Sequence, residues 1–84
     1  MAKSLRSPRQ ERLRTLLIEA RQTAELTQAD VAQRLGKPQS FIAKYEGGER
    51  RLDVVEFLDL AKAIGFDAAK MLRRVQRVVS PGVV

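Results

Sequence analysis

The chain has 84 residues, which suffices for one small domain with a single core, and 44% of its residues are hydrophobic while 31% are charged. It contains no cysteine and no histidine, which excludes disulfides, thiol chemistry, histidine-based acid–base catalysis and most transition-metal sites. The formal net charge of +6 favours a polyanionic partner, although a basic surface is as often simply solvated.

Hydropathy gives no sign of a membrane segment. No apolar run approaches the length needed to span a bilayer, and the basic N-terminus is not followed by the apolar stretch of a signal peptide. No set of side chains suggests a reaction. We therefore expect a cytoplasmic protein with no membrane partner, no cofactor, no metal and no enzymatic activity.

Helix-start signals recur along the chain. Ser7 and Pro8 open a first helix with a hydroxyl cap and a proline in its first turn. Thr27 and Asp53 each begin a capping box, and Asp67 caps a last helix. Apolar residues then follow each start at helical spacing. The expected helices span 7–24, 27–35, 38–46, 53–64 and 67–79.

These helices predict a compact all-α domain, because strand signals are nearly absent and the connections are short. We expect the domain at 7–79, a flexible basic arm at 1–6 and a C-terminal tail at 80–84. The apolar spacing places the following residues in the core: Leu16, Leu17, Val31, Ala32, Ile42, Tyr45, Val54, Phe57, Leu58, Leu60 and Ile64.

Residues 28–47 carry the most specific pattern. Ala32 supplies the small side chain that two steeply crossing helices need at their closest approach. Gly36 suits the left-handed backbone of a tight turn, and Ile42 supplies one apolar residue beneath the next helix. Each feature alone is weak, but their common register predicts a helix-turn-helix with one free face.

This stretch resembles the Cro and phage-repressor family, the XRE-type helix-turn-helix proteins. The resemblance rests on Leu-Thr-Gln-Ala-Asp-Val-Ala-Gln-Arg-Leu-Gly followed by Gln-Ser-Phe-Ile-Ala-Lys-Tyr-Glu-Gly-Gly-Glu-Arg, and it extends over about residues 10–66. It implies a phage-repressor-like five-helix DNA-binding domain, in which the second and third helices form the helix-turn-helix and the third enters the major groove.

The resemblance also implies residue roles. Gln39 and Ser40 would reach base edges, joined one turn later by Lys44. Phe41 is expected beside them, exposed enough to touch a thymine methyl, with half-buried packing as the alternative. The residues expected to contact phosphates are Gln28, Lys37, Arg50 and Arg51.

Two further features follow from the same resemblance. Arg21 and Glu46 match a pair that forms a structural salt bridge in relatives. The family commonly caps the third helix with serine or threonine, whereas this chain has Lys37-Pro38, which can alter where that helix starts and how Gln39 is aimed.

The expected function is sequence-specific regulation of transcription by a dimer on a pseudo-palindromic operator in double-stranded DNA. The last helix either forms the dimer or closes the monomer core. Its candidate interface residues are Phe66, Met71, Leu72, Val75, Val78 and Val79. The alternative function is that of an antitoxin, which neutralises a partner toxin and regulates its own operon.

Overall fold

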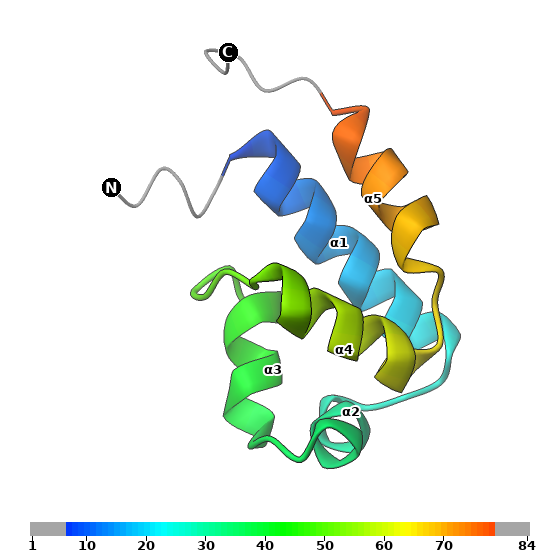
Figure 1. The fold of residues 1–84 in the computed structure, drawn as a ribbon. Helices are drawn as coiled ribbons and strands as arrows, with labels where there is room; N and C mark the ends of the chain where they lie inside the picture. The colour runs from blue at the N-terminus through cyan, green and yellow to red at the C-terminus, as the bar shows by residue number, and fades with distance from the viewer. Residues whose placement is uncertain (1–6, 79–84) are drawn as a thin grey trace.

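The structure is a computed structural model that describes residues 7–78, and within this range it contains five α-helices and no strand. The predicted all-α architecture is confirmed (Figure 1). The arm at 1–6 and the tail at 80–84 lie outside the described residues. The helices are α1 (Pro8–Thr23), α2 (Gln28–Leu35), α3 (Gln39–Glu46), α4 (Val54–Ile64) and α5 (Ala68–Gln76).

Capping residues set where the helices begin. Thr27 and Asp53 form complete capping boxes in front of α2 and α4, and Asp67 accepts from the Lys70 backbone N–H at 2.9 Å in front of α5. The expected helices start one residue too early, because each expected range includes the N-cap residue. An N-cap residue has an extended backbone and lies outside the helix. At Ser7, Thr27, Asp53 and Asp67, only the side chain interacts with the helix, by accepting a backbone hydrogen bond.

The expected end of the last helix at Val79 is wrong, because α5 ends at Gln76. Arg9 of α1 explains the position of this end. Its guanidinium donates to the carbonyl oxygens of Gln76 at 3.2 Å and Val78 at 2.9 Å, and so satisfies backbone acceptors that another helical turn would otherwise occupy. Val79 lies outside the described residues.

One hydrophobic core joins all five helices. Its fully buried side chains come from the first four helices, and Met71 of α5 closes it against α1. The largest of them are Leu16, Leu17, Val31, Ile42 and Leu60. The prediction of Ile42 as a buried residue beneath α3 is therefore confirmed.

The core prediction is wrong at two positions of α4. Leu58 is 49% exposed and Val54 is 72% exposed, whereas Leu60 is completely buried. The α4 face that carries Phe57 and Leu60 points into the core. Successive residues are about 100° apart around a helix. Because Phe57 points into the core, its neighbour Leu58 points away from it.

The turn between α2 and α3 has the geometry that the sequence predicts. Gly36 ends α2 in the left-handed region at φ 69°, and the next residue, Lys37, donates its backbone N–H to the carbonyl of Ala32 at 3.0 Å. Pro38 occupies the cap position of α3 without a side-chain hydrogen bond, so this helix begins at Gln39. Gln39 is therefore the first residue of α3, directly after the unusual Lys37-Pro38 cap.

Candidate nucleic-acid interface

The exposed side chains of α3 share one face. Gln39, Ser40 and Lys44 are all exposed, as expected, and Ala43 is exposed between them. Residues at these spacings are neighbours on a helix surface. Ile42 and Tyr45 occupy the opposite face and are buried. The helix therefore presents a continuous strip, which we define as Gln39, Ser40, Ala43 and Lys44 and call the α3 strip.

Sequence reasoning missed Ala43, although its position four residues after Gln39 is a signal that could have found it. The methyl group of Ala43 projects less far from α3 than the longer side chains on either side of it. A flat or grooved partner surface can therefore approach the backbone of α3 closely. Ala43 also offers an apolar contact between polar ones, which suits the methyl group of thymine.

A salt bridge anchors the far end of α3. The carboxylate of Glu46 accepts from Nε of Arg21 at 2.7 Å and from Nη2 at 3.0 Å, and the two side chains are only 6% and 14% exposed. The expected contact between them is thus present. The hydrogen bond to Glu46 raises the pKa of Arg21 above its ordinary value. Arg21 also donates to the carbonyl of Leu26 at 2.9 Å, which ties the loop before α2 to the same point.

A second arginine of α1 holds the same end and was not foreseen. Arg14 donates to the backbone carbonyl of Glu46 at 2.7 Å and to the carboxylate of Glu11 at 2.6 Å. A cation at a helix C-terminus is favoured by the helix dipole. Its position gives no sequence signal, because the partner is a backbone atom 32 residues away.

Two glutamines connect this anchor to the α3 strip. Gln28 of α2 donates from Nε2 to Oε1 of Glu46 at 2.9 Å, and Gln39 donates from Nε2 to Oε1 of Gln28 at 3.4 Å. Gln28 was expected only as a phosphate contact. Its half-buried position instead places it between the Glu46 carboxylate and the first residue of α3.

The exposed position expected for Phe41 is wrong. Its ring is 9% exposed and meets the Tyr45 ring edge-on, with 5.8 Å between the ring centres and 72° between the planes. Two cations also contact it: Nζ of Lys37 lies 5.1 Å from the ring centre and Cζ of Arg50 lies 4.6 Å from it. The alternative of a packing role for Phe41 fits this environment, since the buried ring supports α3 from its inner side.

The basic residues expected at phosphates occupy different environments. Arg51 and Lys37 are exposed. Arg50 instead makes a two-pronged ion pair with Glu56, at 2.9 and 2.7 Å, and its exposed fraction in this pair is 39%. The charge of Arg50 is thus largely matched within the protein, whereas the other two cations, Lys37 and Arg51, face solvent.

No metal centre is visible in the part of the chain that the structure describes. Within residues 7–78, no group of three or more carboxylate, histidine or cysteine side chains is placed to hold a metal ion. In the same range, no helix combines the length and the apolarity that crossing a membrane requires.

The comparisons with known proteins bear on this geometry. A family model described as a helix-turn-helix domain matches residues 12–74. An XRE-family-like protein from Pseudomonas syringae pv. tomato str. DC3000 has a similar solved structure with a TM-score of 0.78 and 48% sequence identity, over 81% of this chain and 83% of that one. The chain belongs to the XRE-type helix-turn-helix family.

A second solved structure is also similar to this chain. The restriction-modification controller protein C.AhdI from Aeromonas hydrophila has a TM-score of 0.66 and 27% sequence identity, over 71% of this chain and 91% of that one. The comparison with curated proteins found no match. Family membership makes this XRE-type chain a DNA-binding protein of the regulator class rather than an enzyme, in agreement with the sequence analysis.

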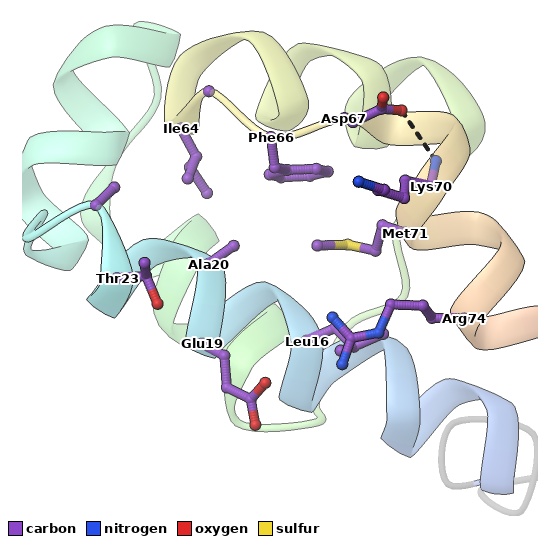
Figure 2. Close-up of a pocket in the computed structure, with 12 residues that line it drawn as sticks. Leu16, Glu19, Ala20, Thr23, Ile64, Phe66, Asp67, Lys70, Met71 and Arg74 are labelled. Atoms are coloured by element: carbon purple, nitrogen blue, oxygen red, sulfur yellow. Dashed lines mark hydrogen bonds between the residues drawn. The ribbon is translucent and has the colours of Figure 1, made fainter.

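The residues expected at a dimer interface divide between the core and the surface. Met71 is buried against α1, so it is not available at the surface and its assignment to an interface is corrected. Figure 2 shows Met71 and Phe66 lining a groove between α1 and α5. Phe66, Val75 and Val78 are half-buried, Leu72 is 47% exposed, and Val79 lies outside the described residues. The inner face of α5 therefore closes the monomer core.

Proposed function

We propose that this XRE-type protein is a sequence-specific regulator of transcription that inserts α3 into the major groove of double-stranded DNA. The α3 strip carries the proposal. Its side chains are exposed along one face, while the opposite face is fixed by Tyr45, Ile42 and the Arg21–Glu46 salt bridge. Because the buried face of α3 is fixed in this way, the orientation of the exposed α3 strip is restrained. A restrained orientation suits the reading of base edges.

The chemistry of the α3 strip matches the groove. Gln39 offers an amide that can pair with both adenine N6 and N7, and Lys44 can donate to guanine or to a phosphate. Ala43 provides an apolar contact for a thymine methyl. Gln28 orients Gln39 through their hydrogen bond and lies in the first turn of α2, where backbone N–H groups also favour a phosphate.

Exposed cations support backbone binding around this strip. Lys37 precedes α3 and Arg51 lies in the loop that follows it, and both face solvent. Phosphate contacts fix the orientation of a protein on the duplex but carry no sequence information. We therefore assign Lys37 and Arg51 to phosphates and the α3 strip to bases.

We further propose that the regulator is a homodimer, whose second copy covers exposed apolar side chains of α4 and α5. Among residues 7–78, the large hydrophobic side chains that stay exposed are Val54, Val55, Leu58 and Leu72. Their exposed fractions correspond to roughly 400 Å² of apolar surface, about half of what one partner contributes to a standard interface.

The position of this apolar surface favours a dimer on DNA. α4 follows α3 after a short loop, and Val54 and Val55 are its first two residues. We propose a two-fold axis close to the start of α4 that places the two copies of α3 about one DNA turn apart, roughly 34 Å. A single module would bury too little surface for tight operator binding.

Selection from a pool of random duplexes, repeated over a range of salt concentrations, tests the proposal. We expect enrichment of a two-fold symmetric site whose half-sites are centred about one helical turn apart. Salt-sensitive binding without an enriched sequence would contradict the proposal. If a second chain also copurified with the protein, that result would favour the antitoxin function instead.

A further inference from the structure

Arg50 joins α3 to the start of α4. It lies in the loop between the two helices and donates from Nη1 and Nη2 to Oε1 and Oε2 of Glu56, at 2.9 and 2.7 Å. Nη1 also donates to the carbonyl of Arg51 at 2.9 Å, and the guanidinium carbon lies 4.6 Å from the centre of the Phe41 ring. One planar group thus contacts a residue of α3, a residue of α4 and the loop between them.

Glu56 gives Arg50 a rigid partner. Its Oε1 accepts from the backbone N–H of Asp53 at 3.0 Å, and its own N–H donates to Oδ1 of Asp53 at 2.7 Å, which is the capping box of α4. The hydrogen bonds from Arg50 and Asp53 lower the pKa of Glu56 to about 2. The carboxylate is therefore charged at neutral pH and fixed to a helix whose other face lies in the core.

Phe41 is the residue of α3 that contacts Arg50, so it links the Arg50–Glu56 pair to this helix. It sits directly after Gln39 and Ser40, and its buried ring packs against Tyr45 on one contact and against Arg50 on another. A rotation of α3 about its own axis would pull the ring away from the guanidinium. The guanidinium over the Phe41 ring therefore limits the angle at which the α3 strip faces outward.

We propose that Arg50 is a positioning residue for sequence reading, which sets the rotation of α3 through Phe41 and does not act as a phosphate ligand. This inference rests on the proposed function, and it replaces the phosphate role that the family resemblance implies for Arg50. The neighbouring Arg51 is fully available to a phosphate. Two adjacent arginines thus have different roles, because Glu56 engages only the first of them.

The decisive comparison is between Arg50→Met and the matched control Arg51→Met, measured as full-length chains on the selected duplex and on duplexes changed at each base pair. Arg50→Met should lose about tenfold in discrimination between bases while the salt dependence of binding stays that of the unmodified chain. Arg51→Met should keep discrimination and lower the slope of log K against log salt by about 0.9.

Two conservative variants separate positioning from charge. Arg50→Lys should fail to restore discrimination, because an ammonium group offers neither a two-pronged fork nor a plane for stacking. Glu56→Gln keeps an acceptor for the capping box but removes the carboxylate, and it should lose discrimination like Arg50→Met. A role in stability alone would lower the unfolding free energy of these variants without changing the discrimination of the folded protein, and that result would overturn the proposal.

A measurement without DNA separates a failure of the positioning role from a failure of the proposed function. Amide hydrogen exchange in α3 should be faster in Glu56→Gln than in the unmodified chain, while exchange in α2 stays the same. If the unmodified chain enriches no sequence, the proposed function fails and exchange still reports whether Arg50 restrains α3. Unchanged exchange in α3, or a lower salt slope with intact discrimination in Arg50→Met, would overturn the positioning role.

Discussion

The side-chain amide of Gln28 donates to Oε1 of Glu46 over 2.9 Å, and the same oxygen accepts from Nη2 of Arg21 at 3.0 Å. One carboxylate at the end of α3 therefore restrains the body of α1 and the first turn of α2 together. Gln39 donates to Gln28 in turn, so a continuous chain of contacts leads from the half-buried salt bridge to the exposed face of α3. Under the proposed function, this chain of contacts couples stability to recognition.

Breaking the Arg21–Glu46 pair should be strongly destabilising. Glu46→Gln removes the charge that compensates a guanidinium with only 14% exposure, and we expect a loss of about 3 kcal/mol in the free energy of unfolding by urea. Glu19→Gln, on the exposed side of α1, is the matched control and should change little. The double variant Arg21→Met with Glu46→Gln should lose less than the sum of the single losses, and strict additivity would contradict the pairing.

Acid should weaken the contribution of Glu56. Its pKa is about 2 in the folded protein and 4.5 ordinarily, so the folded state favours the charged form. The stabilisation is fully present above pH 4.5 and is lost as the pH falls toward about 2. We expect the difference in unfolding free energy between the unmodified chain and Glu56→Gln to shrink over this interval. A difference that stays constant from neutral pH to about pH 2 would exclude the ion pair as its source.

The exposed apolar side chains of α4 and α5 should be needed for dimerisation. Leu58→Glu and Leu72→Glu each place a charge where we expect a second copy, so sedimentation should detect monomers and operator binding should weaken. Gln22→Glu adds the same charge to exposed α1 and serves as the control. Dimers that persist in both leucine variants would place the interface elsewhere.

The turn of the helix-turn-helix should depend on the backbone of Gly36. No atom lies within 4 Å of a Cβ built at this position, so substitution meets no steric obstacle, but φ of 69° is unfavourable for residues with a side chain. We expect Gly36→Ala to cost about 1 kcal/mol in thermal or urea unfolding, and Gly36→Asn to cost less. Equal stability of the alanine variant would show that the turn relaxes to another conformation.

The sequence predicted the local features of this structure better than its long-range contacts. The caps Thr27 and Asp53 and the turn at Gly36 act over a few residues, so the sequence reveals them directly. The apolar pattern of α4 placed both Leu58 and Leu60 in the core, which is wrong for Leu58, because only the packing of α4 decides which face is buried.

The candidate site was predictable in its exposed residues but not in its supports. The resemblance to the helix-turn-helix family implied that Gln39, Ser40 and Lys44 face outward, and all three are exposed. Phe41 contacts Arg50, and Arg50 pairs with Glu56 from another helix. No periodicity links these three residues, so their shared contact emerges only when the loop folds back on α3.

Repeating the selection from random duplexes with Gln39→Ala is the most direct test of base reading by α3. If the α3 strip reads bases, the variant should lose preference at one position in each half-site, with a cost of about 1–3 kcal/mol at the original site, while the remaining positions stay enriched. Enrichment of the same site with the same affinity would contradict the account, because the side chain at the front of α3 would then make no contribution to recognition.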